Sequence, residues 1–254
     1  MICNLPEIIF NEHAKNFYSC SSMTNKCWFL QIRDLCICYL LPHPLTLLTS
    51  PLSKEQFKKL TKSSVIDFWE RKLRKEASVL TSLQYFNPSF MSLSSPHPIW
   101  STAGSSPAKV TMATIQSQML SGRYRTMQLE SHWSTKHSSG FCILSKSCST
   151  SIEDLPHILS SCEALLSVRK KLQRFTLNFC ESFPQVKSLV LKFCQPTHPQ
   201  FCQFLLDCSV LPQVILAKQT YGDEILHHLF SISRTWIYSI HRTRMKMLGR
   251  WNLF

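Results

Sequence analysis

Apolar side chains recur along most of the chain with the 3.6-residue period that a helix imposes on one buried face. In residues 53–80 this face comprises Phe57, Leu60, Trp69, Leu73, Ala77 and Leu80. Ser53, with Gln56 three residues later, predicts a capping box at the start of the helix. We expect a break near Ser63 and Ser64. The lysines on the opposite face are typical of a solvated surface.

Other stretches predict further helices. Residues 25–41 suit a buried helix that Pro42 and Pro44 end. A short helix before Gly122 has this glycine at its C′ position. Asp223 can cap the last helix, whose apolar face comprises Leu226, Leu229, Phe230, Trp236, Ile240 and Met247. Only five glycines are present, too few for the tight turns of an all-β fold. The sequence therefore predicts a mostly α protein without an extended sheet.

One stretch interrupts the helical pattern. Residues 87–110 contain four prolines and seven serines, which favours a linker over a helix. We therefore expect four regions: helical residues 1–86, a Pro/Ser-rich linker 87–112, an Arg-rich helix with a central Cys/His element at 113–182, and a helical tail 183–254.

The net charge of +13 changes this picture by implying a polyanionic partner. Residues 1–100 contain 11 Lys/Arg against 7 Asp/Glu, and residues 101–254 contain 17 against 8. This excess favours nucleic acid over a membrane. A solvated basic surface with no partner is the alternative.

Three basic clusters are candidates for contact with RNA or DNA. Arg123 and Arg125 flank Tyr124, so they can bind a backbone while the ring stacks on a base. The alternative is a pair of arginines that compensate a helix dipole beside a core tyrosine. The full candidate set is Arg123, Tyr124, Arg125, Arg169, Lys170, Lys171, Arg174, Arg242, Arg244, Lys246 and Arg250.

Twelve cysteines raise the possibility of a secreted disulfide protein. The N-terminus instead has Glu7 and Glu12 where a signal peptide would be apolar, and Cys202 and Cys208 lie in apolar runs, as reduced cysteines do. We expect an intracellular protein, in the nucleus or cytoplasm, that is not secreted. We also expect no membrane span, because charges and prolines interrupt the most apolar stretch, residues 28–48.

Residues 140–162 contain the strongest candidate for chemistry. Cys142, Cys148, His157 and Cys162 have the spacing Cys-x5-Cys-x8-His-x4-Cys. Three thiolates and an imidazole suit tetrahedral zinc, and four protein ligands would make the site structural or nucleic-acid-binding rather than catalytic. The x5 loop is longer than is usual, and a chance arrangement among so many cysteines is the alternative.

The sequence offers no comparable catalytic motif. Residues 221–224, YGDE, resemble the Y-x-D-D of polymerases but lack the second aspartate. His227 and His228 have no third ligand at useful spacing. G-x-S-x-G, G-x-G-x-x-G and P-loop motifs are also missing. We expect neither an enzyme nor a small-molecule substrate.

Three stretches resemble the C-terminal region of non-LTR retrotransposon (LINE, jockey-like) endonuclease–reverse transcriptase proteins. These stretches are residues 28–93 (WFLQIRDLCICYLL…NPSFMSL), 119–142 (MLSGRYRT…W…GFC) and 207–251 (DCSVLPQV…YG…ILHHLF…RTWIYSIHRTRMKMLGRW). The resemblance implies a zinc knuckle formed by the Cys142, Cys148, His157 and Cys162 set, which contacts template RNA or target DNA.

The resemblance covers only the region C-terminal to the polymerase domain of that family. It implies a fragment without its own endonuclease or polymerase site, and a full-length reverse transcriptase as a partner. Two alternatives remain open. The helices can form a thumb-like support that packs on the polymerase, or the chain can be a decayed copy that does not fold stably.

Overall fold

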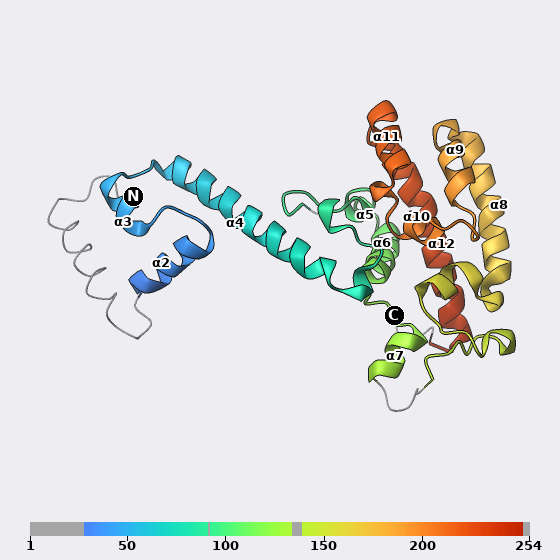
Figure 1. The fold of residues 1–254 in the computed structure, drawn as a ribbon. Helices are drawn as coiled ribbons and strands as arrows, with labels where there is room; N and C mark the ends of the chain where they lie inside the picture. The colour runs from blue at the N-terminus through green and yellow to red at the C-terminus, as the bar shows by residue number, and fades with distance from the viewer. Residues whose placement is uncertain (1–27, 91, 134–138, 251–254) are drawn as a thin grey trace. The chain divides into compact units, whose positions relative to one another are not determined.

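The computed structural model describes residues 28–90, 92–133 and 139–250. All the regular structure in these residues is helical, which confirms the mostly α prediction. The one β interaction among them is an antiparallel bridge between Phe141 and Ile152. The chain divides into two compact units, residues 1–76 and 77–254 (Figure 1).

The first unit contains helices α2 (Trp28–Cys38), α3 (Pro44–Thr49) and α4 (Lys54–Ser78). The predicted capping box is present, because Gln56 N–H donates to Ser53 Oγ (3.2 Å) and Ser53 N–H donates to Gln56 Oε1 (3.0 Å). The expected break near Ser63 and Ser64 is wrong. The Ser63 hydroxyl donates to the Leu60 carbonyl, a local bond that a continuous helix accommodates.

The apolar faces of this unit are less buried than the sequence predicts. No described residue of α4 is fully buried. In α2, Cys36 is buried but Leu35 and Ile37 are exposed, so the prediction of a buried helix at 25–41 is wrong for these positions. The Tyr39 and Phe68 rings meet edge to face at 5.0 Å. Three helices supply too little surface to cover one another.

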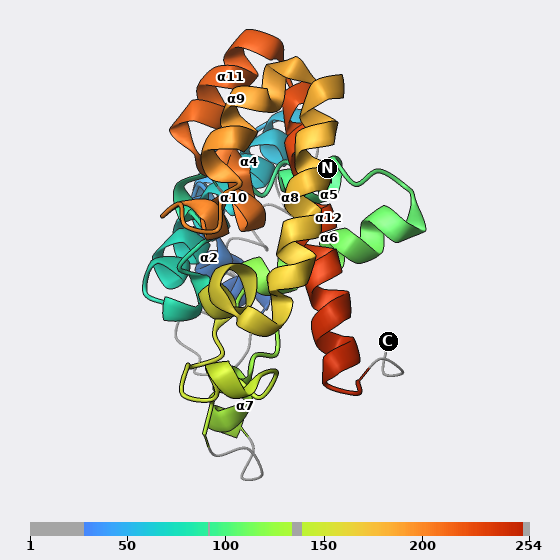
Figure 2. The same ribbon diagram turned by 90° about the vertical axis from the view of Figure 1, so that its right-hand side faces the viewer.

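The second unit contains the main core. Its α-helices are α5 (Pro98–Ser101), α6 (Pro107–Leu120), α7 (Met127–Trp133), α8 (Leu166–Ser182), α9 (Pro184–Phe193), α10 (Phe201–Asp207), α11 (Pro212–Tyr221) and α12 (Glu224–Met247). Its short turns are η1 (Thr81–Leu83), η2 (Pro88–Phe90), η3 (Lys146–Cys148), η4 (His157–Ser161), η5 (Glu163–Leu165) and η6 (Cys208–Val210). Helix α12 contacts α6 and α8 to α11, so it is the central element (Figure 2).

The segment expected to be a linker is part of this unit. Pro98 and Pro107 stand at the first positions of α5 and α6, where a missing N–H costs nothing. Ile99 and Ala103 are 1% and 3% exposed. These prolines therefore begin helices rather than prevent them. The expected boundary at 182/183 is not a boundary in the fold either, because α8 packs on both α9 and α12.

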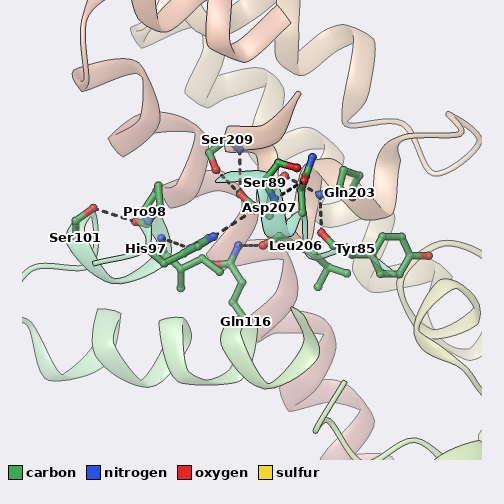
Figure 3. A network of polar contacts seen from close by, with 12 residues as sticks. Tyr85, Ser89, His97, Pro98, Ser101, Gln116, Gln203, Leu206, Asp207 and Ser209 are labelled. Atoms are coloured by element: carbon green, nitrogen blue, oxygen red, sulfur yellow. Dashed lines mark hydrogen bonds and ion pairs between the residues drawn. The ribbon is translucent and has the colours of Figure 1, made fainter. Parts of the chain in front are cut away.

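Polar side chains connect this segment to α10 (Figure 3). His97 Nε2 lies 3.2 Å from a carboxylate oxygen of the buried Asp207, and the other oxygen of Asp207 accepts from Ser209. The amide of the buried Gln116 donates to the Leu205 and Leu206 carbonyls. These bonds satisfy most of the polar groups that would otherwise be costly to bury, although Gln116 Oε1 has no partner among the described residues.

Helix α12 begins after Gly222, as predicted, although Asp223 makes no side-chain capping bond. Gly122 follows the C-cap of α6 with φ of +67°, which confirms it as a C′ glycine. Of the predicted apolar face of α12, Met247 is exposed and the other five residues are buried.

Among the described residues, no single helix is long and apolar enough to cross a membrane, whereas Phe201–Val210 and Pro212–Tyr221, bent by 45°, meet that requirement as a pair.

We predict that His241 makes the fold sensitive to acid. Burial, with the Arg244 charge adding to it, lowers the pKa of His241 to about 4, and the Tyr124 hydroxyl lies 3.1 Å from its Nδ1. An unfolded histidine has a pKa of about 6.5, so between that pH and 4 the unfolded state takes up a proton that the folded state does not. The free energy of unfolding is therefore at its full value above pH 6.5 and decreases by about 3 kcal/mol as the pH falls towards 4.

The measurement is the free energy of unfolding against pH for the parent and for His241→Asn. The curve of the variant should fall less steeply between these two pH values. His132→Asn, on the exposed surface of α7, should leave the slope unchanged. Parallel curves for the parent and His241→Asn would contradict the prediction.

Candidate metal centre

The four predicted ligands lie together in the second unit. One ligand atom from each of Cys142, Cys148, His157 and Cys162 lies within 4.8 Å of all the others, and all four residues are buried. The Sγ atoms of Cys142 and Cys162 are 3.9 Å apart. Four bonds of about 2.3 Å in a tetrahedron place ligand atoms about 3.8 Å apart. This cluster can therefore hold a metal ion.

Local backbone bonds position the first two cysteines. Cys142 N–H donates to Ser151 O, and Glu153 N–H donates to Gly140 O, so the chain folds back between Phe141 and Ile152, the two bridged residues. Within the x5 loop, Cys148 N–H donates to Ser145 O. This turn brings Cys148 back towards Cys142, which explains how the longer spacing is accommodated.

A π-helical turn positions the other two ligands. Residues His157–Ser161 form η4, and Cys162 N–H donates to His157 O at 2.7 Å. This i to i+5 bond is the one that defines a π-turn. It places residues five apart on one side, which is what a His-x4-Cys pair needs. The Asp154 carboxylate accepts from His157 N–H at 2.7 Å and fixes the start of the turn.

His157 has one ring nitrogen available for a metal. Its Nδ1 lies 3.3 Å from the Ser161 hydroxyl, whereas its buried Nε2 has no hydrogen-bond partner in the described chain. Buried ring nitrogens normally have a partner, and in metal sites one nitrogen binds the ion while the other is held by a hydrogen bond. Burial lowers the pKa of His157, which favours the neutral ligand form.

The three thiols accept backbone N–H groups. Glu163 N–H donates to Cys148 Sγ at 3.4 Å, and backbone bonds from Leu144 and Ala164 reach Cys142 and Cys162. Burial nevertheless raises the pKa of Cys142, and burial together with Cys142 raises that of Cys162 to about 12. A metal ion that binds here must displace these protons, so its affinity will rise with pH.

Arg169 supports this cluster from α8 and does not reach solvent. Its side chain is 3% exposed, and Nη2 donates to the Cys162 carbonyl, whereas Nη1 has no partner among the described residues. Burial lowers the pKa of Arg169, and the nearby Cys162 and Cys148 oppose that shift. Three thiolates with a bound dication would carry one net negative charge, which this guanidinium would offset.

Glu153 connects the cluster to α12, a role that the sequence analysis missed. This buried carboxylate accepts from Met127 N–H at 2.9 Å and forms an ion pair with the buried Arg244. Arg244 also lies beneath the Tyr124 ring and 3.5 Å from its hydroxyl. Two features of the sequence could have indicated this contact. One is an acidic residue between two candidate ligands, and the other is an arginine on the apolar face of the last predicted helix.

The candidate nucleic-acid contacts therefore divide into two groups. Tyr124, Arg169 and Arg244 are buried, and Arg250 is half-buried in an ion pair with Glu130, so these four are corrections to the predicted set. Arg169 and Arg244 occupy inward positions of their helices, where their charges are used internally. The exposed members are Arg123, Arg125, Lys170, Lys171, Arg174, Arg242 and Lys246.

We predict that Arg169 strengthens metal binding. Arg169→Gln should lower the affinity for Co²⁺, whose absorption reports tetrahedral thiolate coordination, by about 10- to 100-fold, as loss of outer-shell partners does. Arg174→Gln removes an exposed arginine from the same helix and should leave the affinity unchanged. Equal losses in both variants would show a general charge effect instead.

The chemistry of the donor set is that of a soft or borderline metal ion, because three sulfurs and one nitrogen suit such ions better than magnesium or calcium. Of the two histidines just upstream of Cys142 in the sequence, His132 is exposed on α7 outside the cluster, and His137 lies outside the described residues. Comparison of the chain with known protein families, curated proteins and solved structures finds no match.

Proposed function

We propose that the cluster binds one zinc ion in a structural role. The observation that carries this proposal is the convergence of three thiols and one ring nitrogen of His157 within 4.8 Å. The buried Nε2 of His157 has no hydrogen-bond partner among the described residues, which agrees with a ligand role. Zinc takes four such ligands in a tetrahedron, and a site closed by four protein ligands has no position for a reacting water. Zinc in this position stabilises the connection between residues 140–162 and the helical core, and it catalyses no reaction.

The zinc-stabilised unit binds RNA or DNA through its exposed cations. Lys170, Lys171 and Arg174 lie on successive turns of α8, and Arg242 and Lys246 lie on one exposed side of α12. Such side chains contact phosphates and are largely indifferent to base sequence. The net charge of +13 favours the same class of partner. This binding would take place inside the cell, in the nucleus or the cytoplasm.

The ancestry proposed for the chain is the C-terminal region of a LINE-type reverse transcriptase. The three stretches that resemble this family support it, as does the Cys-Cys-His-Cys order of the ligands. In this role the chain is a nucleic-acid-binding fragment that acts beside a full-length reverse transcriptase and contains no polymerase or endonuclease site of its own.

A structural support is the second candidate function. A groove beside α8 and α9 is lined by apolar and polar side chains, and two of the apolar ones, Leu177 and Leu191, are 50% and 41% exposed. Exposed leucines beside a groove favour contact with another protein surface, as a thumb-like support for a polymerase would need. Salt-sensitive binding of nucleic acid by the isolated chain, if measured, would favour the first function over this one.

We predict one zinc ion per chain. Native mass spectrometry of the purified protein should show one bound zinc, and the double variant Cys148→Ser/His157→Ala should show none, because two of four ligands are lost. A Cys194→Ser variant changes a buried cysteine outside the cluster and should retain the zinc. An equal zinc content in all three proteins would contradict the assignment of these ligands.

We predict that the α8 cations contribute to nucleic-acid affinity. Replacing Lys170, Lys171 and Arg174 with glutamine should weaken binding and reduce the magnitude of the slope of log K against log salt by about 2 for a single strand and about 3 for duplex DNA, because fewer counterions are released. The matched control replaces Lys58, Lys59 and Lys62, exposed lysines of α4. Equal slopes in the parent and the α8 variant would remove α8 from the interface.

A further inference from the structure

Three apolar side chains project outward from the segment that carries the metal ligands. Phe141 and Ile152 are directly opposed in the antiparallel bridge, flanked by the bonds Cys142 N–H to Ser151 O and Glu153 N–H to Gly140 O. Bonds in these flanking positions mark a non-hydrogen-bonded pair, whose side chains lie close together on one face.

Burial alternates along the same segment. Cys142 is 1% exposed and Glu153 is 0% exposed, whereas their neighbours Phe141, Ile143 and Ile152 are 39%, 59% and 50% exposed. Successive side chains of an extended segment point to opposite faces. The inner face therefore holds the metal ligand and the Arg244 partner, and the outer face (Phe141, Ile143 and Ile152) is presented to solvent.

The charges around the outer face favour an anionic ligand. Of the four acids in residues 125–165, Glu153 pairs with Arg244 and Glu130 pairs with Arg250. A third, Asp154, caps the turn at His157, and only the fourth, Glu163, is exposed. Lys146 is exposed in the loop between Cys142 and Cys148.

The size of the outer face favours a base over a protein. A stable protein–protein interface needs about 800 Å² from each partner, far more than three side chains provide. One aromatic ring with two aliphatic neighbours instead matches the flat surface of one or two bases. A duplex keeps its base faces stacked inside, so only an unpaired strand offers them.

We propose that the outer face, Phe141, Ile143 and Ile152, stacks on an unpaired base of single-stranded RNA or DNA, while Lys146 contacts the adjacent phosphate. This inference rests on the proposed nucleic-acid binding and extends it, because it assigns a preference for single strands to one side of the metal centre. The cations of α8 supply affinity that single and double strands share.

The test is fluorescence anisotropy with the full zinc-loaded chain and labelled single-stranded DNA, single-stranded RNA and the matched DNA duplex. Phe141→Ala should weaken binding to the single strands by roughly 5- to 150-fold, the range that loss of one stacked base produces, and should leave duplex binding unchanged. Phe141→Trp retains an aromatic ring and should restore single-strand binding. Phe90→Ala is the matched control, because Phe90 is 54% exposed in η2.

Zinc content, measured by mass spectrometry, verifies that each variant keeps its fold. If Phe141→Ala does not load zinc, Ile143→Ser decides the question, because Ile143 is the most exposed of the three and should also weaken single-strand binding alone. Parent-like binding by zinc-loaded Phe141→Ala and Ile143→Ser would overturn the inference and leave the proposed function intact. Failure of the parent itself to bind any of the three ligands would overturn both. The single-strand arms also show whether the stacking surface prefers RNA or DNA.

Discussion

The buried ion pair between Arg244 and Glu153 is the interaction on which the second unit depends most. It joins the last turns of α12 to the segment between Cys148 and His157, and Glu153 also accepts Met127 N–H from α7. Two charges leave water for this contact, so it stabilises the fold only while both partners remain. Removal of one partner from such a pair typically costs about 3–5 kcal/mol.

The same pair explains how a small cluster of ligands can belong to a large helical core. Helix α12 contacts the other main helices of its unit, and its buried Arg234 donates to the Ile99 and Thr102 carbonyls near α5. Residues 140–162 have little regular structure of their own. On one side these residues converge in the Cys/His cluster, and on the other they pair with α12 through Glu153 and Arg244.

The buried and the exposed cations have separate roles. Arg169 and Arg234 donate to internal carbonyl and hydroxyl oxygens, and Arg244 pairs with a buried carboxylate, so these arginines are unavailable to an outside partner. The exposed cations of α8 and the last turns of α12 can interact with polyanions. A high net charge therefore overstates the charge that a ligand meets, since part of it lies in the interior.

The sequence by itself determined the helical class, the capping box at Ser53, the C′ glycine at Gly122 and the four residues of the Cys/His cluster, because each depends on spacing within a few turns of chain. Only the tertiary structure decided that Pro98 and Pro107 begin helices within a packed unit and that Tyr124, Arg169 and Arg244 face inward. Glu153 belongs to this second group, because its partner lies 91 residues away. Burial of a charge depends on what packs against it, and local spacing does not contain that information.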